Sequence, residues 1–228
     1  MLTIPFSDLH KRSNNQWLLE TSLLLIYFII FSLFSVPYSF ADDKQSLEQP
    51  SEISVKQTNA KARYLRSIEK YTIPDVILTD MEGKRQSFKN LLGSNKPIFL
   101  NFIFTTCPSF CPLLSATFSQ LQGHLMKEPV KPLMFSISID PENDTPEKLR
   151  NYAKKFKAGP NWIFLTGTFD NIKAIEHAFN AYRGEKMNHV PLTYLRKPGQ
   201  PYWIRLDGFS SAKDLLDEYH QVLNSNKN

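Results

Sequence analysis

Residues 97–112 read Pro-Ile-Phe-Leu-Asn-Phe-Ile-Phe-Thr-Thr-Cys-Pro-Ser-Phe-Cys-Pro, and this stretch decides the fold. The run from Pro97 to Phe104 is almost continuously apolar, which is typical of a strand covered on both faces in a parallel sheet. Apolar residues then recur at helical spacing up to Leu125, and residues 133–139 form a second buried strand pattern. Strand, helix and strand in this order predict a right-handed crossover unit.

The rest of the chain continues to alternate strand and helix patterns. The expected elements are strands at 73–78 and 86–88 around a turn at 80–84, a helix at 146–156, a strand at 162–165, a helix at 169–182, strands at 192–196 and 203–206, and a helix at 211–223. This order, with a sharp cysteine-bearing turn after the first long strand, predicts a thioredoxin-like α/β domain.

Length and composition limit the number of domains and the kinds of partner. The chain has 228 residues, of which 42% are hydrophobic and 21% charged, which is enough for one ordinary domain plus a tail. The 27 Lys and Arg residues exceed the 22 Asp and Glu residues and give a net charge of +5. The cations are scattered and not interleaved with aromatic residues, so we expect no nucleic-acid partner.

The N-terminal residues 1–41 have the parts of an export signal. A basic pair at 11–12 precedes an apolar segment, and small residues at Ser39 and Ala41 suit cleavage after Ala41. The alternative is an uncleaved membrane anchor, because residues 17–36 are nearly long enough to span a bilayer. Either interpretation places the rest of the chain in the periplasm, on the inner membrane facing the periplasm, or in the equivalent intermembrane space.

A polar segment separates this hydrophobic part from the domain. Residues 42–70 are rich in Lys, Gln, Ser and Glu, with a weak helical tendency around 59–70. We predict a spacer at 42–70 and a folded unit at 71–228.

The only two cysteines, Cys107 and Cys111, are the strongest chemical signal. Two are too few for a disulfide scaffold or a four-cysteine zinc site. A spacing of four along a helix places both on one face, where they can bind one soft ion or form a disulfide, and a helix start favours their thiolates. Outside the cytosol such a pair also needs a thiol reductant. Copper binding, thiol chemistry, or both remain open.

One histidine stands apart from the others. His189 precedes the strand expected at 192–196, and in a thioredoxin-like domain the turn before that strand lies beside the redox turn. His189 would then complete a donor set of two sulfurs and one nitrogen, which suits copper. The alternative is an exposed loop histidine. The remaining histidines lie in the export segment or in predicted helices: His10, His124, His177 and His220.

Two acidic residues after the second buried strand have ordinary structural explanations. We expect Asp140, followed by Pro141, to end the strand and Asp144 to cap the next helix. Neither is predicted to bind metal.

Taken together, these motifs resemble those of the Sco/SenC family over residues 71–223. The matching segments are residues 107–112, residues 137–147 (Ile-Ser-Ile-Asp-Pro-Glu-Asn-Asp-Thr-Pro-Glu), residues 165–168, and His189 with 194–195. The resemblance implies a membrane-tethered or exported protein that binds one copper ion, Cu(I) or Cu(II), through Cys107, Cys111 and His189.

The resemblance also implies a role and partners. Such a protein helps to assemble the copper centre of cytochrome c oxidase, by delivering copper or by reducing the cysteines of the oxidase. Its partners would be the oxidase copper subunit or another copper acceptor, and a thiol reductant. It would be a metallochaperone rather than an enzyme with turnover.

The sequence departs from the family pattern around the histidine. Asn188 replaces the usual Asp, so a carboxylate that could orient the imidazole is absent, and we expect weaker copper binding. The stretch at 183–188 is shorter than the usual loop. Pro191 precedes the next strand, as the cis-proline of thioredoxins does. The bond between Val190 and Pro191 is therefore a candidate cis peptide, although only about 5–6% of such bonds in folded proteins are cis.

Two other functions compete with this interpretation. The first is a metal-independent thiol-disulfide oxidoreductase that uses Cys107 and Cys111 and does not need His189. The second is a peroxide reductase, which is disfavoured because such enzymes normally have a Thr several residues before the cysteine and a nearby Arg, and no second cysteine four residues later.

Overall fold

The computed structural model describes residues 64–224. The expected export or anchor segment at 1–41 and most of the expected spacer therefore lie outside the described residues. Within 64–224, no helix is long and apolar enough to cross a membrane.

A mixed sheet of eight strands in the order β1-β8-β7-β4-β5-β6-β2-β3 forms the centre of the domain. The strands are β1 (Tyr64–Lys70), β2 (Ile77–Asp80), β3 (Arg85–Ser87), β4 (Ile98–Ile103), β5 (Leu133–Ser138), β6 (Trp162–Thr166), β7 (Leu192–Arg196) and β8 (Tyr202–Gly208). The helices are α2 (Phe88–Leu92), α3 (Cys111–Leu125), α4 (Pro146–Lys155), α5 (Phe169–Ala178), the 3-10 helix η1 (Lys186–Asn188) and α6 (Ala212–Asn224).

The predicted central strand is confirmed. All six residues of β4 are buried, and β4 runs parallel to β5 and antiparallel to β7. β5 in turn pairs in parallel with β6, so β4, β5 and their connection through α3 form the expected crossover unit. The thioredoxin-like α/β class predicted from the alternating patterns agrees with this mixed sheet and its helices.

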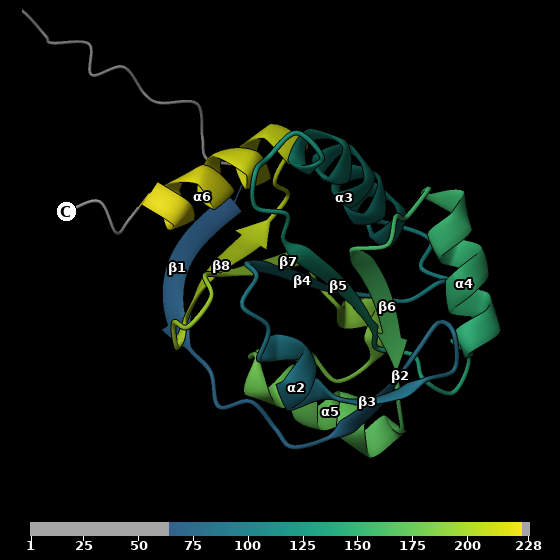
Figure 1. Ribbon diagram of the computed structural model, residues 1–228. Helices are drawn as coiled ribbons and strands as arrows, with labels where there is room; N and C mark the ends of the chain where they lie inside the picture. The colour runs from purple at the N-terminus through teal and green to yellow at the C-terminus, as the bar shows by residue number, and fades with distance from the viewer. Residues whose placement is uncertain (1–63, 225–228) are drawn as a thin grey trace, which may run out of the picture. The chain divides into compact units, whose positions relative to one another are not determined.

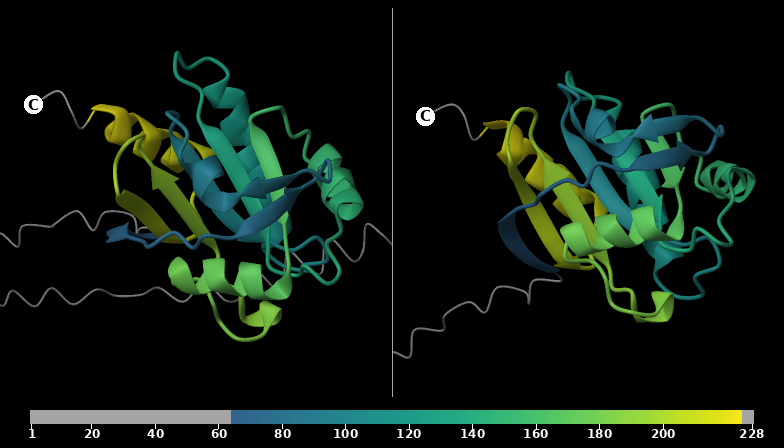
Figure 2. Two further views of the ribbon diagram at one scale, coloured as in Figure 1. Left: turned by 60° about the horizontal axis from the view of Figure 1, so that its bottom comes forward. Right: turned by 90° about the horizontal axis from the view of Figure 1, so that it is seen from below.

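Helices cover both faces of the sheet (Figures 1 and 2). On one face, the Phe99 ring of β4 packs against Phe118 of α3 and Tyr219 of α6. On the other face, the Phe102 ring packs against Phe179, which follows α5, and against Tyr194 of β7. Because side chains alternate along a strand, one apolar strand supplies the core on both sides.

The expected start of the domain at residue 71 is wrong. Residues 64–70 are neither spacer nor helix but the edge strand β1, which pairs antiparallel with β8 from Tyr64 opposite Gly208 to Lys70 opposite Tyr202. Arg66 of β1 also forms an ion pair of 2.8 Å with the buried Glu218 of α6. The strand partner of β1 lies far along the chain, so the local polar composition did not reveal it.

The region between β2 and β4 holds a smaller correction. β3 ends at Ser87, where the side chain accepts a hydrogen bond from the backbone amide of Asn90 and starts the short helix α2. The expected return strand at 86–88 is therefore confirmed as β3, which pairs antiparallel with β2, but Phe88 already belongs to a helix that the sequence analysis did not include. The turn before it is as expected, with Gly83 at a positive φ of 85°.

Candidate metal centre

The two cysteines lie in and just after the turn that joins β4 to α3. The backbone amide of Cys107 donates to the Phe104 carbonyl at 3.2 Å, and Cys111 is the first residue of α3. Cys107 therefore precedes the helix, and the expectation that both cysteines share one helical face is wrong. Pro112 explains the boundary, since a proline is accommodated in the first helical turn but not further inside.

The turn nevertheless brings the two thiols into contact, in unequal environments. Both side chains are buried, and both are free thiols. Burial alone would raise the pKa of Cys107, but hydrogen bonds from the backbone amides of Cys111 and Ser109, and from the Cys111 thiol, lower it overall. Burial raises the pKa of Cys111, and the nearby Cys107 and Asp144 raise it further. A hydrogen bond with the Phe104 backbone lowers this pKa but does not outweigh the other effects.

Asp144 anchors the cysteine turn instead of capping α4, so the capping expectation is wrong. Its fully buried carboxylate accepts hydrogen bonds from the backbone amide of Thr105 at 3.0 Å, from the Thr105 hydroxyl at 2.5 Å and from the Ser138 hydroxyl at 2.6 Å. The cap of α4 is Thr145, whose side chain accepts from the Lys148 amide. The end of β5 is thereby tied to the segment that leads into Cys107.

His189 follows η1, and only 5% of the residue is exposed. The ring packs against Phe110, the residue before Cys111, with the ring centroids 5.0 Å apart. Burial, with a smaller contribution from the Arg183 charge, lowers the pKa of His189 to about 4 despite the nearby Phe102 backbone. Neither ring nitrogen has a hydrogen-bond partner among the described residues. The imidazole is thus neutral at pH 7, close to the Phe102 backbone but without a well-formed hydrogen bond in the described chain.

Charged groups hold the loop that carries His189. The Lys186 ammonium lies 2.6 Å from the carboxylate of Asp140, which is buried, and 5.8 Å from the Phe104 ring. As expected, Asp140 lies just beyond the end of β5. The Asn188 side chain donates to the Arg183 carbonyl at 3.4 Å.

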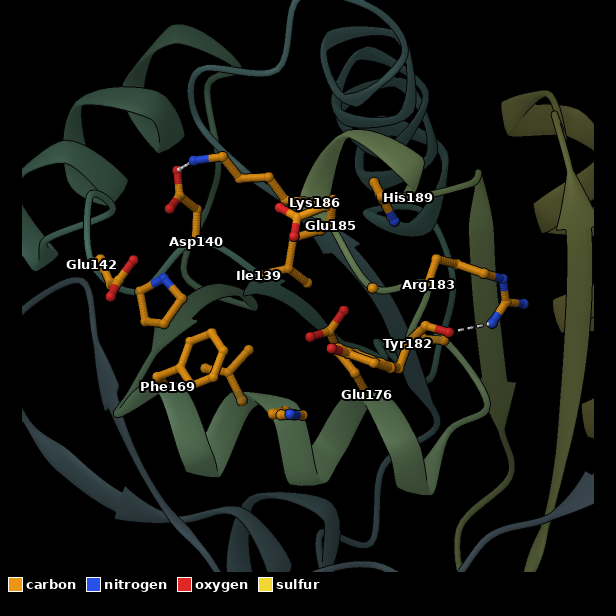
Figure 3. Close-up of a pocket in the computed structure, with 15 residues that line it drawn as sticks. Ile139, Asp140, Glu142, Phe169, Glu176, Tyr182, Arg183, Glu185, Lys186 and His189 are labelled. Atoms are coloured by element: carbon orange, nitrogen blue, oxygen red, sulfur yellow. Dashed lines mark hydrogen bonds and ion pairs between the residues drawn. The ribbon is translucent and has the colours of Figure 1, made fainter.

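A cavity of about 270 Å³ lies behind this loop, between α5 and the segment after β5 (Figure 3). Glu176 and Tyr182 reach into it from one side and His189 from the other. Burial raises the pKa of Glu176 to about 7. The cavity beside the candidate centre is therefore lined by a neutral imidazole and by a partly buried carboxyl group that is readily protonated.

The three predicted ligands are only partly brought together. Cys107 and Cys111 are in contact, and the His189 ring packs against Phe110, the residue before Cys111. In residues 64–224, no three His, Cys, Asp or Glu side chains are gathered closely enough to hold a metal ion. The described chain also has no cis peptide bond, so the bond between Val190 and Pro191 is trans.

The sequence analysis missed two residues that shape this region. Phe110 packs against the His189 ring and against the ring of Phe209, which is 41% exposed and whose centroid is 6.3 Å away. The role of Asp144 was also missed, although the run from Asp140 to Asp144 after a buried strand could have signalled a buried acidic network. No local pattern pointed to Phe209, because its contact with Phe110 joins distant parts of the chain.

The sequence of this chain matches known proteins over most of the described domain. The sequence profile of the SCO1/SenC family matches residues 69–224. The SCO1 protein homolog of Bacillus subtilis is 35% identical over 99 residues, which cover 42% of this chain and 50% of that protein. This chain therefore spans half of the length of that relative.

The fold matches solved structures as well. The structure of Arabidopsis thaliana ScoI with copper bound is 27% identical, with a TM-score of 0.56, and covers 65% of this chain and 96% of that one. Yeast Sco1 with copper bound is 25% identical, with a TM-score of 0.57, and covers 65% of this chain and 86% of that one. The profile match over residues 69–224 and these structural likenesses agree: the chain belongs to the SCO1/SenC family.

Proposed function

We propose that this protein carries one copper ion, held by Cys107, Cys111 and His189, as cargo for the copper centre of cytochrome c oxidase. The observation that carries the proposal is the buried, neutral and unpartnered imidazole of His189 next to a buried thiol pair. A buried polar group without a partner is costly, and a metal bond would relieve that cost. Two sulfurs and one imidazole are a donor set that suits copper.

Copper loading would require proton release and a local movement. Both thiols bind metal as thiolates, so Cys111, whose pKa burial raises, would lose its proton as copper binds. The ring of His189 would approach the sulfurs by a shift of the 183–189 loop past Phe110. Release would follow by ligand exchange, when an acceptor site of higher affinity replaces these donors one at a time.

The unequal thiols favour a second function, the reduction of a partner disulfide. Cys107, with the lower pKa, would attack one partner sulfur as a thiolate and form a mixed disulfide, and the displaced partner thiolate would take up a proton. Cys111 would then lose its proton and attack the Cys107 sulfur, which releases the second partner thiol. The partner gains two electrons, Cys107 and Cys111 become a disulfide, and a thiol reductant restores them.

Location and partners follow from the same proposal. Export through residues 1–41, or anchoring through 17–36, would place the domain in the periplasm or the intermembrane space. There the acceptor would be the oxidase copper subunit, or another copper protein, with its own cysteines to be loaded or reduced.

Anaerobic titration of the reduced full chain with Cu(I), in competition with a chromophoric chelator, tests the copper proposal. We expect one tightly bound copper ion, loss of tight binding in Cys107→Ser, and at least tenfold weaker binding in His189→Ala. His220→Ala is the matched control, because that imidazole is half-exposed and paired with Glu128 at 2.9 Å. Unchanged affinity in His189→Ala would refute the three-ligand site.

The same variants separate the two functions. A metal-independent oxidoreductase would reduce a disulfide substrate equally well with His189→Ala, while Cys107→Ser would abolish the reaction. Copper transfer as the main role requires His189→Ala to lose copper while both thiols remain titratable.

A further inference from the structure

A second cavity lies at the opposite end of α3 from the cysteines. Its volume is about 400 Å³, and Cys111 and Leu125 at the two ends of α3 are about 20 Å apart at 1.5 Å per residue. The end of α3, the start of β5 and the segment between α4 and β6 form its walls. The lining residues are Gln122, Leu125, Met126, Lys131, Pro132, Met134, Lys157, Gly159, Pro160 and Asn161.

This cavity combines apolar walls with positive charge. Its lining contains two lysines, Lys131 and Lys157, and no acidic residue. Within residues 64–224, neither lysine forms an ion pair, and both are exposed. Met126 at the rim is 69% exposed, which is unusual for a large apolar side chain. The pocket therefore offers an apolar space and two free cations to one ligand.

Lys157, one of the two lysines of the cavity, has an unusual backbone conformation. α4 ends in a Schellman motif, in which the Ala158 amide bonds to the Ala153 carbonyl and the Lys157 amide to the Lys154 carbonyl. Lys157 has a φ of 53°, in the left-handed region that favours glycine. The corresponding position after α5 is Asn180, with a φ of 51°, and asparagine is well tolerated there. Lys157 therefore adopts a backbone conformation that costs stability for a residue other than glycine.

The walls of the cavity are fixed by hydrogen bonds. The Gln122 side chain donates to the Lys157 carbonyl at 3.1 Å and accepts from the Gly159 amide at 2.6 Å. The Ser119 hydroxyl donates to the Phe156 carbonyl at 2.7 Å. These bonds join α3 to the segment after α4 and fix that side of the cavity.

We propose that this cavity binds an anionic amphiphile, namely a free medium-chain fatty acid, with its acyl chain against the apolar wall and its carboxylate between Lys131 and Lys157. The apolar lining favours burial of the acyl chain. The two unpaired lysines, with no acidic residue in the lining, favour a negatively charged head group. The site uses none of the groups of the candidate metal centre, so it stands independently of the proposed copper function.

Calorimetric titration of the full chain with a series of carboxylates from hexanoate to dodecanoate, kept below their micelle concentrations, tests the proposal. Affinity should rise up to about fourfold with each added methylene and level off once the cavity is filled. Decyltrimethylammonium, which pairs a ten-carbon chain like that of decanoate with a positive head group, should bind at least tenfold more weakly. No binding of decanoate, or equal binding of the two decyl probes, would overturn the proposal.

Paired variants assign the binding to this cavity. The double variant Lys131→Gln, Lys157→Gln should weaken decanoate binding about five- to twentyfold. The control Lys148→Gln, Lys154→Gln removes the same charge from exposed positions of α4 outside the cavity and should leave binding unchanged. Equal losses in both double variants would mean non-specific attraction and overturn the proposal.

Lys157→Gly separates folding from binding. Glycine relieves the left-handed backbone, so the melting temperature should rise by about 2–4 °C, while decanoate affinity falls about two- to fivefold. Asn180→Gly is the matched control at the end of α5 and should leave decanoate affinity unchanged. Binding to phosphatidylglycerol vesicles without binding of free decanoate would assign the patch to a membrane surface and refute the fatty-acid site.

Discussion

The cysteine turn and the His189 loop are the two halves of the candidate metal centre, and the fold holds them very differently. Asp144, fully buried, fixes the cysteine turn through three hydrogen bonds to Thr105 and Ser138. The His189 loop is held by the Lys186–Asp140 ion pair, in which Lys186 is 38% exposed, and its imidazole has no hydrogen-bond partner in the described chain. One half is anchored by a fully buried carboxylate, and the other by an ion pair at the surface.

Replacement of the buried Asp144 should cause the largest loss of stability. Asp144→Ala leaves the amide and hydroxyl of Thr105 and the hydroxyl of Ser138 without their acceptor, so we expect a loss of about 3–4 kcal/mol in the free energy of unfolding. Denaturant unfolding monitored by circular dichroism measures it, with Asp75→Ala as the exposed control. A loss below about 1 kcal/mol would mean that the cysteine turn does not depend on Asp144.

The pH dependence of stability should report the buried imidazole. Burial lowers the folded-state pKa of His189 to about 4 from 6.5, so the unfolded chain binds the proton first and stability is lost as the pH falls from about 6.5 to 4. The loss should be about 2–3 kcal/mol in metal-free protein. His189→Ala should flatten this part of the profile, and an unchanged slope would show that His189 is solvated.

Glu176, on the other side of the same cavity, should act in the opposite direction. Burial raises its pKa to about 7 from 4.5, so its contribution to stability is complete below about pH 4.5 and is lost as the pH rises to 7. Because the side chain is only partly buried, the loss should be about 1 kcal/mol. The other charged and titratable groups that line this cavity are Asp140, Glu142, Lys173, Tyr182, Arg183, Glu185, Lys186 and His189.

Glu176→Gln should remove this loss and leave the His189 part of the profile in place. Thermal unfolding at closely spaced pH values across the range of both titrations resolves the two contributions. Retention of the loss between pH 4.5 and 7 in Glu176→Gln would assign it to another group.

The smallest effect on stability is expected from the Lys186–Asp140 ion pair, which holds the His189 loop. Lys186→Met removes a half-exposed ion pair and should cost about 1 kcal/mol or less. It should nevertheless increase the rate at which diethylpyrocarbonate modifies His189, because the loop is released from Asp140. Lys186→Arg should keep the wild-type rate. If Lys186→Met leaves the rate unchanged, the ion pair does not hold the loop.

Much of the fold could be predicted because its signals are local. The apolar run at 97–104 marks a strand buried on both faces, and the helical spacing after it marks α3. β1 could not be predicted in this way, because only its pairing with β8 makes a polar segment into a strand. The same holds for Asp144, since a capping position and a buried anchor look alike until Thr105 and Ser138 are placed around it.

By itself, the sequence determined the α/β alternation, the cysteine pair after the central strand and His189 as its candidate partner, because spacing and periodicity are properties of neighbouring residues. Only the tertiary structure decided which carboxylate anchors the turn, that Phe110 lies against the imidazole, and that the two thiols differ. Burial and hydrogen bonding set these properties, and both depend on residues that are distant in the chain and meet only in the folded domain.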